Sequence, residues 1–268
     1  MKKNILNLLF TVLLFSCGSS MEDKTNDTSS RDSSTLSITG IRQQIKAYPD
    51  SFLLKENLIQ LLRDSGNYKA AIEQTRSFLH QDSINPRLFH MLGFLYFENG
   101  DTLQAIHAFE QSYQIIPDPQ ELILAGKLHA LKGNPQSMII ADTLMASRLP
   151  ENALQAYFIR GLFFENRHEY AKAIEAFEEC LKLDYTQTEV YLEKAKSQCE
   201  IDKWNDAIVT LKKAVTIRNN FAEGYLLLAQ CYEHQKNNKS AAEAYRRNLL
   251  YEPENEEALE GLERVTED

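Results

Sequence analysis

The residues best able to do chemistry in this 268-residue chain are six histidines and several pairs of neighbouring acids. No two histidines have metal-ligand spacing, and the HExxH pattern, glycine-rich phosphate loops and the GxSxG elbow are all absent. Adjacent acids such as Glu178 and Glu179 point about 100° apart on a helix and cannot both face one substrate. The sequence therefore predicts no metal, no cofactor and no enzyme. Two buried carboxylates or a Cys–His pair in one cleft would reverse that expectation.

Three cysteines lie in the body of the chain, at Cys180, Cys199 and Cys231, without CxxC spacing. An odd number cannot form a complete disulfide framework. We expect them to behave as small buried hydrophobic residues.

The overall composition indicates a globular, helical and acidic protein. Apolar residues make up 43% of the chain, and 10 Gly and 7 Pro give little turn punctuation for a many-stranded β fold. With 29 Lys and Arg against 38 Asp and Glu, the formal net charge is -9. Such a surface repels phosphate backbones, so we expect no nucleic-acid partner.

The first residues have the pattern of an export signal. Lys2 and Lys3 precede a largely apolar run from Ile5 to Phe15, which is too short to span a bilayer. The tetrad Leu14-Phe15-Ser16-Cys17 resembles the lipobox of bacterial lipoproteins. That resemblance implies a signal peptide at 1–16 and a lipid (palmitate-type acyl) attachment at Cys17. The alternative is an ordinary secretory leader that leaves a free cysteine.

The segment after the cysteine is rich in Ser, Thr and Asp, so residues 17–34 are interpreted as a flexible tether. The residue after the cysteine is Gly18 and not Asp, which in the resembled lipoproteins goes with delivery to the outer membrane. Glu22 and Asp23 resemble acidic surface-export signals, although solubility alone also explains them. We expect an outer-membrane protein on the periplasmic face, with the cell surface as the alternative.

The rest of the chain repeats with a period near 34 residues. Related triads begin at Gly66, Gly100, Gly133, His168, Asp202 and Lys236. Six units therefore begin at residues 52, 86, 119, 154, 188 and 222. At unit position 20, five of the six residues are alanine: Ala71, Ala105, Ala173, Ala207 and Ala241. A period of this length is typical of repeats that stack one on the next.

The pattern resembles the tetratricopeptide repeat, a pair of antiparallel helices. Its large position 4 is met by residues such as Phe89 and Tyr157, and its small position 8 by Gly93, Gly126 and Gly161. The resemblance implies an all-α, right-handed α-solenoid of six helix pairs over residues 50–268. We expect an N-terminal capping helix within 35–49 and a C-terminal capping helix at 255–266. In the third unit, His129 and Asp142 depart from the aromatic pattern, so its second helix is expected to pack loosely or be displaced.

In the resembled family, the inner wall of the solenoid is built mainly from positions 2, 5, 9, 12 and 13 of each first helix. The candidate partner-binding groove here consists of Arg87, His90, Phe94, Phe97, Ile123, Lys127, Phe158, Leu162, Leu192, Lys196 and Leu226. Apolar side chains not needed by the core are candidate anchors, and the basic ones could pair acids of a peptide. Two alternatives remain: curvature buries these side chains, or the N-terminal helix covers them.

These patterns together predict a non-catalytic, lipid-anchored scaffold in the bacterial cell envelope. It would act as an adaptor or assembly factor that binds an unidentified envelope protein or peptide in its groove. The alternative function is a surface nutrient-capture lipoprotein that binds glycan or peptide fragments. That role would require exposed aromatic side chains beyond those used in repeat packing.

Overall fold

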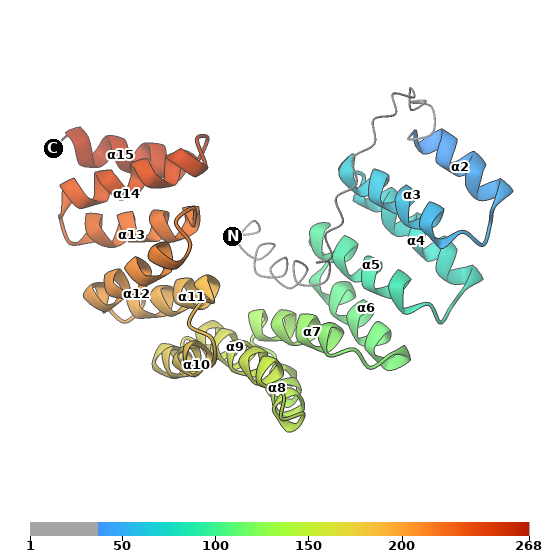
Figure 1. Ribbon diagram of the computed structural model, residues 1–268, viewed down its shortest axis with the longest axis horizontal. Helices are drawn as coiled ribbons and strands as arrows, with labels where there is room; N and C mark the ends of the chain where they lie inside the picture. The colour runs from blue at the N-terminus through green and yellow to red at the C-terminus, as the bar shows by residue number, and fades with distance from the viewer. Residues whose placement is uncertain (1–36, 268) are drawn as a thin grey trace, which may run out of the picture. The chain divides into compact units, whose positions relative to one another are not determined.

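The computed structural model describes residues 37–267, and every helix or strand assigned in that range is an α-helix. In chain order, the helices are α2 (Ile38–Ala47), α3 (Phe52–Asp64), α4 (Tyr68–Gln81), α5 (Pro86–Glu98), α6 (Thr102–Ile115), α7 (Pro119–Leu131), α8 (Gln136–Ala146), α9 (Pro150–Asn166), α10 (Tyr170–Leu183), α11 (Thr188–Cys199), α12 (Trp204–Ile217), α13 (Ala222–His234), α14 (Asn238–Tyr251) and α15 (Glu256–Glu267) (Figure 1). The predicted signal peptide, Cys17 and the tether lie outside the described residues. No helix within 37–267 has the length and apolar character needed to cross a membrane.

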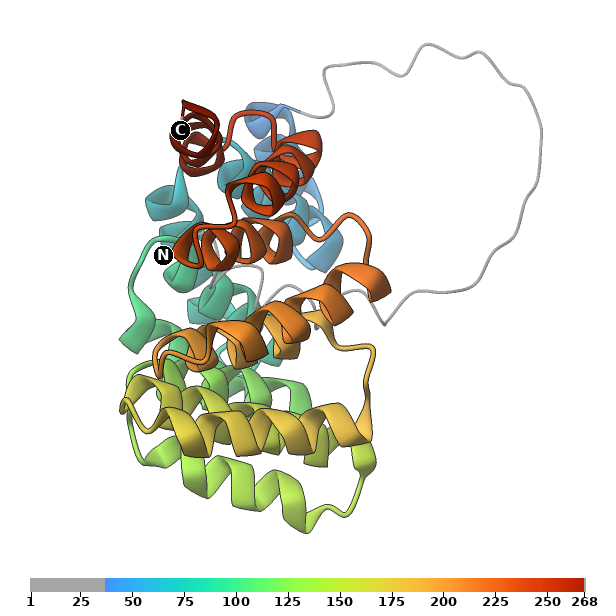
Figure 2. The same cartoon turned by 90° about the vertical axis from the view of Figure 1, so that its left-hand side faces the viewer.

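The chain divides into two compact units, with the boundary between Ala125 and Gly126 inside α7. In unit 1, consecutive helices from α2 to α6 contact one another, with the tightest packing between α5 and α6. In unit 2, consecutive helices from α8 to α15 do the same, and their ribbon runs from green through yellow to red in Figure 2. The first helices α9, α11 and α13 also contact one another in that order. The predicted all-α fold of consecutive helix pairs is confirmed.

Each recurring triad forms the turn between the two helices of its unit. The first residue of every triad has a positive φ, between 58° and 89°, at Gly66, Gly100, Gly133, His168, Asp202 and Lys236. In each turn the amide of the next residue donates a hydrogen bond five residues back, as from Asn67 to the Leu62 carbonyl at 3.0 Å. This left-handed cap ends a helix while satisfying its last carbonyls. The sequence triad therefore recurs because the same turn occurs once in every unit.

Small residues at positions 8 and 20 let the two helices of a unit approach closely. The alanines that recur at position 20, such as Ala71 and Ala105, have no exposed surface. A Cβ added to Gly93 would lie 2.4 Å from the Phe109 ring, and one added to Gly161 would lie 2.3 Å from the Phe177 ring. In these two units, an aromatic ring of the second helix therefore occupies the space left by the missing side chain. This close packing offsets the helix propensity that glycine lacks.

The two terminal helices and α8 show how units differ from the repeat. Helix α2 lies within the predicted range 35–49, and α15 begins and ends one residue later than the predicted 255–266. Helix α15 buries Ala258, Gly261 and Val265 and exposes its glutamates. Helix α8 is three residues shorter than α10 but still buries Ile140, Ala141 and Leu144. It is therefore a shortened but packed helix.

Candidate functional site

Lys127 is the most unusual charged residue at an inner position of unit 2. It lies on α7, its side chain is buried (2% exposed), and its ammonium lies 5.2 Å from the centroid of the Phe158 ring on α9. Within the described part of the chain, Lys127 makes no salt bridge to a carboxylate. Burial lowers its pKa to about 8, although the negative charge of Glu189 opposes this effect. The ring face stabilises the cation only in part, so Lys127 is a buried charge without a full counter-charge.

A second cluster joins α9 and α11 around Glu165. The Ser197 hydroxyl donates to Glu165 Oε1 at 3.3 Å, and Lys196 Nζ lies 2.8 Å from Glu193 Oε1. Burial, followed by the nearby charge of Glu193, raises the pKa of Glu165 to about 8. Glu165 therefore holds a proton at neutral pH, while Lys196 is already paired with Glu193.

Glu165 and Glu193 partly meet the condition set above for an enzyme, because Glu193 is buried, Glu165 is partly buried, and the two carboxylates interact electrostatically. Neither carboxylate lines either of the two described surface hollows. The nearest hydroxyl, that of Ser197, is fully buried and donates its hydrogen bond to Glu165, so it is not an available nucleophile. Within residues 37–267 there is also no group of three or more His, Cys, Asp or Glu suited to a metal. Within residues 37–267, Glu165 is thus a protonated carboxyl group that lines neither described hollow.

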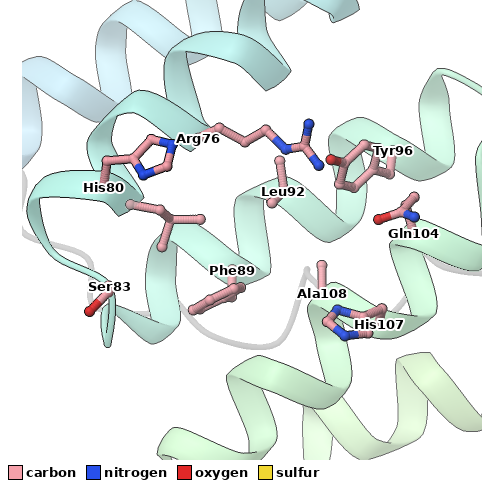
Figure 3. A pocket seen from close by; sticks show the side chains of 10 residues that line it. Arg76, His80, Ser83, Phe89, Leu92, Tyr96, Gln104, His107 and Ala108 are labelled. Atoms are coloured by element: carbon pink, nitrogen blue, oxygen red, sulfur yellow. The ribbon is translucent and has the colours of Figure 1, made fainter.

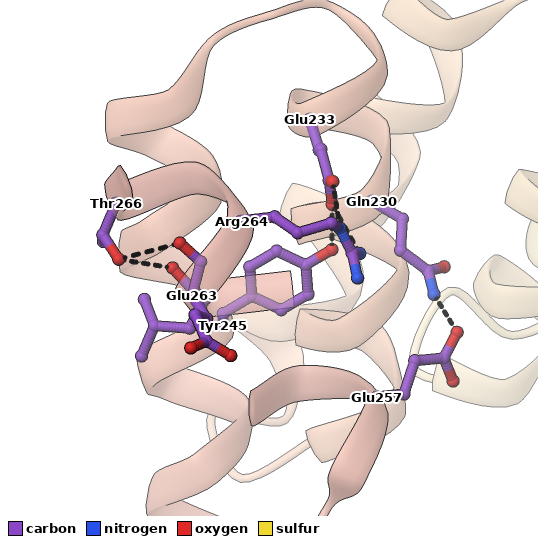
Figure 4. Close-up of polar contacts among 8 residues, drawn as sticks. Gln230, Glu233, Tyr245, Glu257, Glu263, Arg264 and Thr266 are labelled. Atoms are coloured by element: carbon purple, nitrogen blue, oxygen red, sulfur yellow. Dashed lines mark hydrogen bonds and ion pairs between the residues drawn. The ribbon is translucent and has the colours of Figure 1, made fainter. Parts of the chain in front are cut away.

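At the end of unit 2, a polar network centred on Glu233 of α13 connects α13 to the last helix, α15 (Figure 4). Arg264 of α15 donates through Nε to Glu233 Oε1 at 2.9 Å, and the Tyr245 hydroxyl of α14 donates to the same carboxylate. Gln230 donates to Glu257 of α15 at 2.6 Å. The hydrogen bond from Arg264 holds the pKa of Glu233 below its usual range. These polar groups fasten the terminal helix and are not free to bind a partner.

In unit 1, most inner polar residues are paired within the unit. Arg63 of α3 donates through Nε to Glu98 of α5 at 2.7 Å, and His90 Nδ1 lies 2.6 Å from Glu121 Oε1. Arg87 differs, because it is exposed and its only described contact is a cation–π interaction with Phe52, 5.6 Å from the ring centroid. Arg87 therefore presents an unpaired positive charge at the surface of unit 1.

The predicted groove residues divide into a buried and an accessible set. Six are buried: Phe94, Ile123, Lys127, Phe158, Leu162 and Leu192. Five are exposed or partly exposed: Arg87, His90, Phe97, Lys196 and Leu226. The phenylalanines of the buried set pack on the second helices, with Phe94 edge-on to Phe109 at 5.3 Å and Phe158 tilted on Phe177 at 5.9 Å. In this structure they are packing residues, because the small position 8 brings those rings within reach.

An unpredicted hollow lies on unit 1, between α4 and α6 and above α5 (Figure 3). Its volume is about 440 Å³, with Phe89 and Leu92 of α5 among its lining residues. Arg76 and His80 of α4 stand on one side and Gln104 and His107 of α6 on the other. Their spacings of four and three residues place each pair on one helical face, which is the signal that sequence reasoning missed.

Comparison with known families identifies the repeat. A family model described as "Tetratricopeptide repeat" matches residues 86–119, 154–187 and 222–255. These three matches begin at the starts of three of the units defined by the 34-residue period. They also coincide with the helix pairs α5–α6, α9–α10 and α13–α14.

Two solved structures have a similar fold. A tetratricopeptide repeat protein from Parabacteroides merdae has a TM-score of 0.69 at 19% identity, covering 86% of this chain and 91% of that one. The structure of PilW, described as a widely conserved type IV pilus biogenesis factor, has a TM-score of 0.61 at 19% identity, covering 80% and 97%. At these identities the likeness shows the fold alone.

Among curated proteins, the DnaJ homolog subfamily C member 7 homolog of Dictyostelium discoideum is 25% identical over 242 residues, which are 88% of this chain and 40% of the relative. The Hsp70-Hsp90 organizing protein of Triticum aestivum is 24% identical over 101 residues, covering 38% of this chain and 17% of the relative. The chain thus spans less than half the length of each of these two relatives.

Proposed function

Because this chain is a tetratricopeptide-repeat protein, we propose that it is a non-catalytic, lipid-anchored scaffold of the bacterial envelope that binds an acidic segment of a partner protein. The observation that carries the proposal is an exposed, unpaired positive charge at an inner position of unit 1 in an otherwise acidic chain. Arg87 makes no ion pair among residues 37–267, while the net charge of the whole chain is -9. A carboxylate of a partner would supply the missing counter-charge.

The accessible set of inner residues indicates how such a partner would be held. In unit 1, Phe97 is partly exposed and apolar, and Arg87 is exposed and cationic. A peptide that alternates apolar and acidic side chains fits this chemistry, because aromatic and Arg side chains contribute most to binding at interfaces. The nutrient-capture alternative has less support. Tyr185 and Tyr251 of unit 2 are exposed but lie at the ends of different helices, and Tyr251 stacks with Tyr225 of the same unit, with ring centroids 6.3 Å apart.

We expect the double variant Arg87→Glu with Phe97→Ala to reduce partner recovery from envelope extract by roughly tenfold or more, because it reverses one contact charge and removes one apolar anchor. Recovery is measured by quantitative mass spectrometry with the purified protein as bait. Buried Phe94 and Phe158 are left intact, since truncating a buried phenylalanine costs about 3–5 kcal/mol and would confound binding with unfolding.

The matched control for this experiment is Lys69→Glu on α4, which reverses an exposed charge outside the inner positions and outside the hollow described above. It should recover partners as the wild type does. If both variants lose the partners equally, or neither does, the inner face is not the binding site. Circular dichroism shows whether each variant keeps its helicity.

The anchor is tested separately, because Cys17 lies outside the described residues and the proposal there rests on the lipobox resemblance. We expect Cys17→Ser to move the protein from the membrane to the soluble fraction, since without acyl chains nothing in 37–267 spans a bilayer. The measurement is fractionation of cells followed by immunoblotting, with helicity unchanged. Membrane retention equal to wild type would rule out the lipid anchor.

A further inference from the structure

Two cysteines of unit 2 lie in contact on neighbouring first helices. Cys199 is the last residue of α11 and Cys231 lies within α13, and their Sγ atoms are 3.5 Å apart. Both are free thiols in this structure. A disulfide requires an S–S distance of about 2.05 Å, so the two sulfurs must move closer before a bond can form. The two residues are 32 positions apart, so only the stacking of two repeats brings them together.

The two thiols differ in access. Cys231 has no exposed surface, whereas Cys199 is only partly buried, so a dissolved reagent reaches Cys199 first. The hydrogen bond with Cys231 lowers the pKa of Cys199, and the same contact raises the pKa of Cys231. Cys199 is therefore the thiol that ionises more easily and attacks, and Cys231 is placed to resolve the product.

We propose that Cys199 and Cys231 form an oxidisable dithiol that exchanges with a disulfide oxidant and closes a bond between α11 and α13. In the first step, the Cys199 thiolate attacks one sulfur of the oxidant, forming a mixed disulfide and releasing one thiolate. In the second step, Cys231 loses its proton and attacks the Cys199 sulfur, displacing the second thiolate. The protein loses two electrons and two protons, and the oxidant becomes two thiols.

The bond would act on the inner face of unit 2. Lys196 lies one helical turn before Cys199 on α11, and Gln230 precedes Cys231 on α13. Oxidation would fix the spacing of these two first helices by a covalent bond, which the reduced pair lacks. The proposal does not depend on a partner, so it stands or falls separately from the scaffold function.

Cys180 provides an internal control in the same unit. It has no exposed surface, its thiol donates to the Leu154 carbonyl at 3.3 Å, and burial raises its pKa well above the usual range. No described cysteine contacts it. It should stay reduced under conditions that oxidise the pair.

The test incubates the reduced full chain with oxidised glutathione, blocks remaining thiols with iodoacetamide and digests with trypsin without reductant. We expect a linked peptide pair, 197–203 with 219–236, and an unlinked, alkylated Cys180 peptide, 173–182. The variant Cys231→Ala should instead trap a glutathione adduct on Cys199, because the resolving thiol is gone. The variant Cys199→Ser should leave Cys231 free of glutathione.

The outcomes that overturn the proposal are equally distinct. A glutathione adduct that persists on Cys199 in the wild type would show that Cys231 cannot resolve it. Links that include Cys180 or Cys17 in similar yield would show that the contact does not direct the reaction. Circular dichroism of each variant establishes that it is folded before oxidation, and Cys199→Ala replaces Cys199→Ser if the serine variant is not.

Discussion

Replacing Glu165 by glutamine should stabilise the protein at alkaline pH by roughly 2–4 kcal/mol and leave it unchanged near pH 4.5. Burial and the charge of Glu193 raise the pKa of Glu165 from 4.5 to about 8. Each pH unit between these two pKa values corresponds to about 1.4 kcal/mol of stability. The expected gain is smaller than the full product because solvent partly screens the Glu165 side chain. Glutamine keeps the shape and the neutral state that the folded protein prefers.

The sign follows from proton binding. Between pH 4.5 and 8, the folded protein keeps the Glu165 proton while the unfolded chain has lost it. The unfolded chain therefore binds fewer protons, and the free energy of unfolding falls as pH rises through that window. Wild type should lose this contribution between pH 4.5 and 8, and Glu165→Gln should not.

The measurement is urea unfolding followed by circular dichroism at pH 4.5, 6, 7 and 9, compared as the difference between variant and wild type. The control is Glu243→Gln at an exposed position of α14, which should change the free energy of unfolding by no more than about 0.5 kcal/mol at any of these pH values. A pH-independent difference for Glu165→Gln would show that Glu165 titrates normally in the folded protein.

Replacing Lys127 by methionine should raise the free energy of unfolding at pH 7. Burial lowers the pKa of Lys127 from 10.5 to about 8, which corresponds to about 3 kcal/mol of unfavourable charge burial at about 1.4 kcal/mol per pH unit. Methionine has a similar length and can keep the contact with Phe158 without the charge. The gain should therefore be about 2–3 kcal/mol, since the cation–π interaction is lost.

The pH dependence of this effect is opposite to that of Glu165. Below pH 8 both the folded and the unfolded protein carry the Lys127 charge, and the full cost is present. Between pH 8 and 10.5 only the unfolded chain keeps the proton, so wild-type stability rises with pH. The advantage of Lys127→Met should therefore shrink across that window and vanish near pH 10.5.

Lys239→Met, on the exposed side of α14, is the matched control and should alter the free energy of unfolding by less than about 0.5 kcal/mol. The comparison is made by urea unfolding at pH 7, 9 and 10.5. If Lys127→Met is less stable than wild type at pH 7, the lysine has a counter-charge in the folded protein.

The two predictions together bear on the proposed function. Lys127 and Glu165 both occupy inner positions, and the charged form of each is disfavoured by burial. Because Lys127 is only 2% exposed, a partner does not contact it directly, and we expect Lys127→Met to recover the proposed partner as the wild type does.

The repeat could be predicted from sequence because its signals are local. The glycines Gly66, Gly100 and Gly133 favour left-handed turns because glycine adopts a positive φ readily. The regular spacing predicts the same turn at His168, Asp202 and Lys236, where φ is also positive. The alanines at position 20 and the glycines at position 8 likewise predict close helix pairs, and the rings of Phe109 and Phe177 fill the spaces beside Gly93 and Gly161. A helix pair is one short-range unit, and so its sequence specifies it.

The inner face was decided only by tertiary structure. The position of Phe94, Phe158 or Lys127 within its unit predicts the face of the helix on which the side chain lies. It does not predict how closely the neighbouring helix approaches, and that close approach buries all three side chains. The contact of Cys199 with Cys231 and the pairing of Arg63 with Glu98 likewise join different repeats. Burial, pKa and thiol contact depend on distances between elements remote in the chain, and a one-dimensional pattern does not contain those distances.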